Sequence, residues 1–176
     1  MPRAPGRRGA PWGTKVSMSS NRILGVALAC LALVACAAKP PKPVEAKALL
    51  SVSSDVNPDS SGRASPIVVR VYQLRGDAEF NGAEFFDLYD KEKETLGASL
   101  ILRQEYVLQP GEQRQLEIAL SQEARYLGAI AAFRDIRTAH WRVISPAPEK
   151  GLADMLSKDR VTIGVEKTAI TLRIKD

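Results

Sequence analysis

The sequence predicts an all-β fold, a two-sheet β-sandwich of about eight strands with a short helical insertion. Three observations lead to this expectation. Apolar and polar residues alternate with a period of two along most of the chain after residue 46, as in half-buried strands. Short turn motifs separate the alternating stretches. The regular helices that connect the strands of a parallel α/β sheet are missing from the pattern.

The expected strands are short and mostly alternate in polarity. Leu116 and Ile118, for example, alternate with Gln115 and Glu117. Residues 125–133 (RYLGAIAAF) are apolar on both faces, which predicts a central strand. The expected strands cover residues 47–53, 66–74, 99–108, 113–120, 125–134, 140–145, 160–166 and 169–175.

Two connections have the chemistry of tight turns. Pro110 and Gly111 occupy the second and third positions of Gln109–Glu112, which predicts a type II turn. Glu166 and Lys167 predict a short hairpin link between the last two strands.

A helical insertion is expected over residues 77–97, where the alternation stops. Asn81 is a candidate N-cap with Glu84 three residues later, the arrangement of a capping box. Gly97 can end the segment with a positive φ. The aromatic face of this segment either packs a short helix on the sandwich edge or lines a ligand pocket; it consists of Phe85, Phe86 and Tyr89.

Asp55–Ala64 (DVNPDSSGRA) is rich in turn-forming residues and lies between the first two expected strands. It is longer than a hairpin requires. Long exposed loops on a rigid sandwich often bind partners, and the alternative is a mobile link without a function.

The same loop only partly resembles a calcium-binding loop. Asp55, Asn57 and Asp59 stand at alternate positions, but Ser60 replaces the required Gly and Pro66 the required Glu. No metal site is therefore predicted here.

The N-terminal residues 1–35 are expected to be a leader with a lipoprotein signal peptide. Ile23–Ala35 is apolar and follows Arg22; as a helix it would span roughly 20 Å, too short for about 30 Å of hydrocarbon but suited to a signal peptide. Translation starts at Met1 or Met18. A start at Met18 would make residues 1–17 an over-extended gene start.

Leu33-Val34-Ala35-Cys36 resembles the lipobox of bacterial lipoproteins. Cys36 is therefore the expected lipidation site, with an N-acyl diacylglyceryl group as its covalent lipid. The alternative is an ordinary secretory signal in which Cys36 is incidental. Cys30 has Ala27 in place of the expected Leu and is rejected.

Residues 36–46 are expected to form the lipidated end and a proline-rich spacer before a domain at 47–176. The spacer favours an extended conformation. Residue 37 is Ala and not the Asp that retains many lipoproteins in the inner membrane, so the expected location is the periplasmic face of the outer membrane.

The charge of the chain is concentrated in its leader. The sequence has 25 Lys+Arg and 20 Asp+Glu, a formal net charge of +5. Five of the basic residues and no acidic residue lie in residues 1–35, so residues 36–176 carry 20 of each sign. Nucleic-acid binding requires a basic surface on the folded domain, so no nucleic acid is expected as a partner.

No motif for catalysis appears in the sequence. His140 is the only histidine, and no cysteine follows Cys36, so a transition-metal site is not expected. Nucleophile elbows and phosphate-binding glycine loops are missing. We therefore expect no enzyme activity, no small-molecule substrate and no cofactor other than the lipid.

Five segments in a fixed order resemble a known family. They are SPIVVRVYQL (65–74), FNGAEFFDLYD (80–90), LQPGE (108–112), RYLGAIAAFRD (125–135) and WR (141–142). With the lipobox, they make residues 36–176 similar to TssJ (SciN), the outer-membrane lipoprotein of the type VI secretion system.

The resemblance implies a transthyretin-like sandwich and an anchoring function. The family binds the periplasmic C-terminal domain of the inner-membrane protein TssM, within the TssJ–TssL–TssM complex. The family's partner-binding loop corresponds by position to Asp55–Ala64. The residues expected to contact the partner are Asp55, Val56, Asn57, Asp59, Ser60 and Arg63.

Two other functions stay open. One is a periplasmic lipoprotein that binds a small ligand or another surface-assembly subunit, which a deep apolar pocket in the sandwich would favour. The other is a periplasmic hydrolase, which two carboxylates with perturbed pKa values across a cleft would favour.

Overall fold

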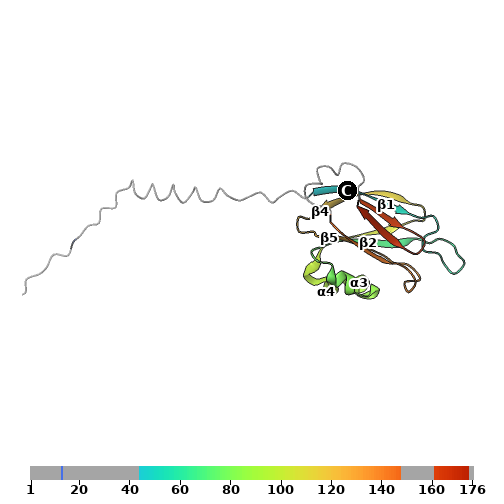
Figure 1. Ribbon diagram of the computed structural model, residues 1–176, viewed down its shortest axis with the longest axis horizontal. Coiled ribbons are helices and arrows are strands. Elements are labelled where there is room, and N and C mark those ends of the chain that lie inside the picture. The colour runs from blue at the N-terminus through green and yellow to red at the C-terminus, as the bar shows by residue number, and fades with distance from the viewer. Residues whose placement is uncertain (1–12, 14–43, 148–160, 175–176) are drawn as a thin grey trace, which may run out of the picture. The chain divides into compact units, whose positions relative to one another are not determined.

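Two four-stranded β-sheets pack face to face in the computed structural model, which describes residue 13, residues 44–147 and residues 161–174 (Figure 1). The first sheet has the order β4-β1-β7-β8 and the second β3-β2-β5-β6. The strands are β1 (Val44–Val52), β2 (Ile67–Leu74), β3 (Leu100–Leu108), β4 (Gln113–Leu120), β5 (Tyr126–Ala131), β6 (Arg142–Pro146), β7 (Val161–Val165) and β8 (Ile170–Ile174). The all-β sandwich is confirmed, and each predicted strand overlaps an observed one.

The predicted turns are also present. The N–H of Glu112 donates to the carbonyl oxygen of Gln109 at 3.1 Å, and Gly111 has a φ of 77°. Between β7 and β8, the N–H of Glu166 donates to the carbonyl oxygen of Ala169 at 2.7 Å. These local hydrogen bonds close the two antiparallel connections where the sequence placed them.

Strand β1 begins earlier than predicted. It starts at Val44 rather than at residue 47, because Val44 and the residues after it pair with β4 from Leu120 backwards. Residues 44–46, predicted to belong to the spacer, are therefore part of the first sheet. The segment between Cys36 and this strand is reduced to residues 37–43.

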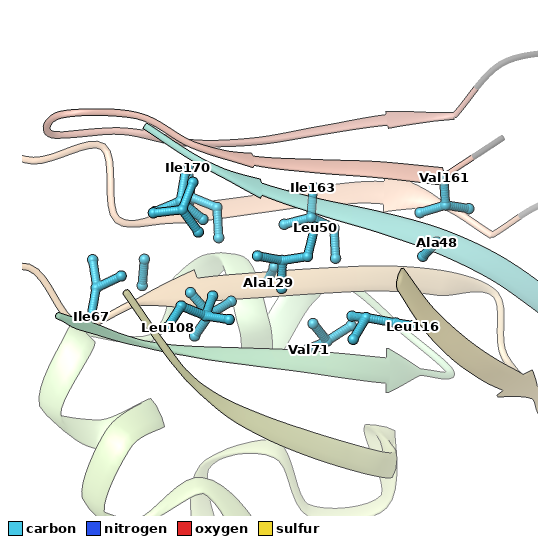
Figure 2. Close-up of a cluster of buried hydrophobic side chains, with 14 of the residues drawn as sticks. Ala48, Leu50, Ile67, Val71, Leu108, Leu116, Ala129, Val161, Ile163 and Ile170 are labelled. Atoms are coloured by element: carbon cyan, nitrogen blue, oxygen red, sulfur yellow. The ribbon is translucent and has the colours of Figure 1, made fainter. Parts of the chain in front are cut away.

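The space between the sheets is filled by aliphatic side chains. Alternate residues of β1, β2, β4, β5 and β7 point inward and are almost fully buried, as the period-two pattern requires, and those of β3, β6 and β8 are mostly half-buried. Figure 2 shows part of this cluster, which includes Ala48, Leu50, Ile67, Val71, Leu108, Leu116, Ala129, Val161, Ile163 and Ile170. The sandwich interior is thus a packed core.

The two middle strands of the second sheet, β2 and β5, are buried on both faces. A second apolar cluster, which includes Tyr72, Leu74 and Ile130, lies between the outer face of this sheet and the helical insertion (Figure 1). Strand β5 therefore lies between two packed layers and between β2 and β6, which confirms the prediction of a central strand.

The insertion is a series of short helices. They are α2 (Ala78–Gly82), α3 (Phe85–Asp90), α4 (Glu92–Leu96) and the 3-10 turn η2 (Gly97–Ser99). The predicted capping box is wrong: Asn81 lies inside α2, and Glu84 precedes α3 in an extended conformation without a side-chain cap. The helical conformation is interrupted at Ala83 and Glu84, which allows the side chains of both Phe80 and Phe85 to pack against the sheet.

Two half-buried arginines hold the short helices on the sheet. Arg142 Nη1 donates to the carbonyl oxygens of Phe80 at 2.7 Å and Ala83 at 2.8 Å, around the end of α2. Arg70 donates to the carbonyl oxygen of Tyr89 at 2.6 Å and pairs with Glu105 at 2.6 Å. Charge-assisted bonds of this kind satisfy helix-end carbonyls that have no partner within the helix.

Candidate functional site

Four connections meet at one end of the sandwich, here called the distal end: residues 53–66, 109–112, 132–141 and 166–169. Backbone hydrogen bonds join them. The N–H of Ser53 donates to the carbonyl oxygen of Val165 at 2.8 Å, and the carbonyl oxygen of Ser53 accepts from the N–H of Gly111 at 3.2 Å. The N–H of Ile170 donates to the carbonyl oxygen of His140 at 2.9 Å. Strand β1 runs from Val44 toward this end, so the chain before Val44 joins the sandwich at the opposite end, here called the entry end.

Asn57 fixes the base of the β1–β2 loop. Its side chain donates to the carbonyl oxygen of Pro66 at 2.9 Å and accepts from the backbone N–H of Arg134 at 2.8 Å. Its own N–H donates to the carbonyl oxygen of Lys167 at 3.0 Å. Asn57 has a φ of 49°, a conformation that Asn tolerates better than most residues. One residue thus connects three segments through its side chain and its backbone.

Val56 and Asn57 do not expose their side chains to solvent. Val56 is fully buried in the core between the sheets, and Asn57 is 4% exposed. Of the six residues predicted to contact a partner, these two therefore shape the loop from within.

The tip of the loop is held by Asp59. Its Oδ1 accepts from the backbone N–H groups of Ser61 at 2.8 Å and Arg63 at 3.0 Å. Its Oδ2 accepts from Arg63 Nε at 3.0 Å. The bond from the Arg63 backbone N–H is the main cause that lowers the pKa of Asp59, with further contributions from the Ser61 N–H and the Arg63 side chain, so this carboxylate stays ionised.

The tip is therefore pre-shaped and open to solvent. Gly62 has a φ of 78° and closes the turn by donating to the carbonyl oxygen of Asp59 at 2.9 Å. Asp55, Ser60 and Arg63 are exposed, and Asp59 is half-buried. A loop that is ordered before binding loses less conformational entropy on association than a mobile one.

The structure adds residues that the sequence did not point to. Residues 133–138 of the β5–β6 connection and Lys167 lie beside the loop and line a hollow with it. The sequence predicts Phe133 and Arg134 at the end of a strand, but β5 ends at Ala131. No local pattern separates a connection from a strand end here, since Phe133 continues the apolar run.

His140 also departs from its predicted strand. Strand β6 begins at Arg142, and His140 forms an isolated bridge with Ala169 of the β7–β8 link. Its backbone donates to Thr168 and accepts from Ile170, both at 2.9 Å. The residue connects the two sheets through its main chain.

The described carboxylates give no support to the hydrolase alternative. Where their pKa values are shifted, at Asp59, Glu79 and Glu112, hydrogen bonds lower them. A general acid at neutral pH requires a raised pKa. In residues 44–147 and 161–174, no group of three or more His, Cys, Asp or Glu side chains is placed to hold a metal ion.

The tether lies outside the described residues. The leader, Cys36 and the spacer residues up to 43 stay predictions of the sequence, apart from the correction at Val44. Among the helices in the described part of the chain, none has both the length and the apolar character needed to cross a membrane.

A family model for type VI secretion lipoproteins, with VasD, EvfM and TssJ among its members, matches residues 45–168. The chain belongs to the TssJ family. This membership makes it a lipoprotein component of the type VI secretion system, and the family is membrane-bound. No curated protein is similar enough in sequence to be matched.

Solved structures of TssJ-type lipoproteins share the fold. TssJ1 from Pseudomonas aeruginosa is 31% identical, with a TM-score of 0.68, over 76% of this chain and 98% of that one. Lip of Serratia marcescens, a membrane-bound component of the type VI secretion system, is 28% identical, with a TM-score of 0.65, over 73% and 96%. The TssJ-family assignment and the sandwich thus rest on sequence and structure alike.

Two further chains share the fold at lower identity. One belongs to a structure described as a type VI membrane complex, at 24% identity and a TM-score of 0.64 over 74% of this chain and 98% of that one. The other belongs to a structure described as the TssM C-terminal domain from EAEC, at 23% and 0.58 over 73% and 96%.

Proposed function

We propose that this TssJ-family protein is a non-enzymatic anchor. Its lipidated Cys36 holds it on the periplasmic face of the outer membrane, and its distal end binds the periplasmic C-terminal domain of TssM. Through TssM it fixes the TssJ–TssL–TssM complex to the outer membrane. The lipid supplies the membrane affinity, since two or more acyl chains anchor stably.

The position of the distal end carries this proposal. The chain enters the sandwich at Val44, and strand β1 separates this point from the loop at 53–66. Nine strand residues at about 3.3 Å each place the two ends roughly 30 Å apart. The pre-shaped loop is therefore presented at the end of the sandwich opposite Val44, where a protein that crosses the periplasm can reach it.

The remaining support comes from the family and the core. The chain belongs to a family of type VI secretion lipoproteins, and the fold recurs in structures described as a type VI membrane complex and the TssM C-terminal domain. The latter two matches share the fold alone, so the partner is our inference. The filled core does not favour a small ligand held between the sheets.

Tethering also affects how strong the interface has to be. A domain held within a few nanometres of the membrane meets a membrane-linked partner at a high effective concentration. A modest interface at the loop is then sufficient in the assembled complex.

The test replaces only the exposed tip of the loop. Ser60, Ser61 and Arg63 are changed together to Gly in the full-length lipoprotein, which keeps the buried Val56 and Asn57 in place. We expect binding to the purified TssM periplasmic domain to weaken at least tenfold. The matched control changes Ser121, Gln122 and Glu123 at the entry end to Gly and should bind as the unmodified protein does. Absence of binding by the unmodified protein would refute the TssM assignment.

A further inference from the structure

A hollow of ≈ 840 Å³ lies at the distal end beside the loop tip. Four segments line it: residues 57–60, Phe86 of α3, residues 133–138, and residues 167–168. Asn57 fixes its shape, because its backbone and side chain bond to Lys167 and Arg134 on two of the other walls. We call this feature the distal groove.

Apolar side chains form part of the distal groove. Phe133 is 6% exposed, so its ring belongs mostly to the core and offers only an edge. Phe86 is 63% exposed, the highest value among the large hydrophobic residues exposed in the described part of the chain. Exposed aromatic side chains at the wall of a concave surface are typical of binding hot spots.

Phe86 is held in place by a packed neighbour. Its ring meets that of Phe85 edge-on, with centroids 5.3 Å apart. Phe85 in turn is buried, stacks on Tyr89 and meets Trp141 edge-on, both at 5.3 Å. The ring of Phe86 therefore packs on one side against a buried aromatic cluster. Its other side faces solvent and makes no contribution to the core.

The groove wall has three cationic and two anionic side chains, a formal excess of one positive charge. Its cationic side chains are Arg134, Arg137 and Lys167, and its anionic ones Asp59 and Asp135. Both carboxylates are engaged: Asp59 accepts from the turn that it closes, and Asp135 Oδ2 accepts from Thr138 Oγ1 at 2.8 Å.

The cationic side chains of the groove form fewer hydrogen bonds and ion pairs than its carboxylates. Arg137 lies 3.9 Å from Asp135, with 90% of its side chain exposed. Within residues 44–147 and 161–174, Arg134 and Lys167 have no carboxylate within ion-pair distance. Complementary charge on a partner would complete this arrangement.

We propose that the distal groove receives an acidic segment of the TssM periplasmic domain, which places an apolar side chain against Phe86 and carboxylates beside Arg134 and Lys167. This inference rests on the proposed function and specifies its chemistry. An anionic membrane surface is disfavoured as the occupant, because the groove lies at the end of the sandwich opposite the entry of the tethered chain.

The experiment measures binding of the full-length lipoprotein, in detergent, to the purified TssM periplasmic domain. Phe86→Ala is expected to weaken binding about tenfold. Arg134→Ala combined with Lys167→Ala is expected to weaken it about fivefold and to reduce its dependence on salt. Matched controls are Leu102→Ala on strand β3, an exposed apolar residue, and Arg125→Ala at the entry end; both should bind normally.

A photo-crosslinker then identifies the occupant directly. A benzoylphenylalanine at position 86 should crosslink to a TssM peptide that contains Asp or Glu, and the same probe at position 102 should not. Thermal melting of each variant checks that the sandwich is intact.

The outcomes separate the two proposals. If the unmodified protein binds TssM but the groove variants bind as well as their controls, the groove assignment is overturned and the anchoring function stands. A crosslinked peptide without acidic residues also overturns it. If the unmodified protein does not bind TssM, the proposed function fails and the groove proposal fails with it.

Discussion

The side-chain oxygen of Asn57 accepts a hydrogen bond of 2.8 Å from the backbone N–H of Arg134, which lies 77 positions further along the chain. Asn57 belongs to the connection between the first two strands, and Arg134 to the connection after β5. This bond and the one from Asn57 to Pro66 leave the Asn57 side chain little freedom. The loop proposed to bind TssM is thus part of the sandwich framework at its base and free only at its tip.

Asn57→Ala should destabilise the domain. It leaves the part-buried N–H of Arg134 and the carbonyl oxygen of Pro66 without their partner, and it places Ala, which tolerates positive φ less well than Asn, at a φ of 49°. We expect a loss of about 2–4 kcal/mol in the free energy of unfolding, measured by urea denaturation. Ser60→Ala, an exposed change on the same loop, should alter it by less than about 0.5 kcal/mol. Equal stability of the two variants would show that Asn57 does not anchor the loop.

Gly128→Ala should disturb the contact between β5 and the helical insertion. A β-carbon at this position would lie 2.9 Å from the Phe80 ring, which is fully buried and cannot easily move. The expected loss is about 1–3 kcal/mol in the free energy of unfolding. The effect should shrink in a Phe80→Leu background, since the two positions are coupled.

Gly82→Ala is the matched control for that substitution. Gly82 ends α2 and has open space around it, so Ala there should be neutral or stabilise by up to about 1 kcal/mol. Similar losses at positions 82 and 128 would contradict the steric explanation.

Asp59 should titrate below the ordinary value of 3.8 for an aspartate. Because the folded pKa is lowered, the ionised carboxylate stabilises the loop tip above the unfolded pKa, and this contribution is lost as the pH falls through the folded pKa. The tip should therefore keep its structure at neutral pH and loosen only in acid below pH 3.8. An NMR titration of the side-chain carboxyl carbon measures the pKa.

Arg63→Ala distinguishes the causes of that shift. The backbone N–H of residue 63 is the largest cause and survives the substitution, whereas the side-chain bonds at 3.0 Å and 2.8 Å are removed. The pKa of Asp59 should rise but remain below 3.8. A value at or above 3.8 would mean that the guanidinium dominates.

Cys36→Ser should abolish lipid attachment without affecting the fold. We expect loss of fatty-acid labelling and loss of outer-membrane fractionation, because one residue carries all the acyl chains. Cys30→Ser, six positions earlier in the same apolar segment, should keep both. Continued labelling of the Cys36 variant would contradict the lipobox assignment.

Much of the sandwich could be predicted because its signals are local. Pro110 and Gly111 define a turn within four residues, and alternation at Leu116 and Ile118 defines which face of β4 is buried. The double-sided apolar run at 125–133 correctly indicated a central strand. Such patterns depend on residues a few positions apart, where chain geometry fixes the relation between side chains.

The predicted contact residues of the loop show where this reasoning stops. Asp55, Val56 and Asn57 are consecutive residues of one connection, and no local pattern in the sequence separates their roles. In the structure, Val56 lies in the core and Asn57 forms hydrogen bonds to two other connections. The broken helices of the insertion depend in the same way on Phe80, Phe85 and the sheet beneath them. The choice of the exposed loop residues as TssM contacts stays a prediction.

The sequence by itself determined the strands, their inward faces, the turns, the family and the predicted lipid site. Only the tertiary structure decided that β1 pairs in parallel with β7, more than a hundred residues away, and that residues 57–60, 86, 133–138 and 167–168 share one groove. The physical reason is the sequence distance over which each kind of interaction acts. Backbone preferences and hydrophobic periodicity act over a few residues, whereas the meeting of distant segments is settled by how all the buried faces pack together at once.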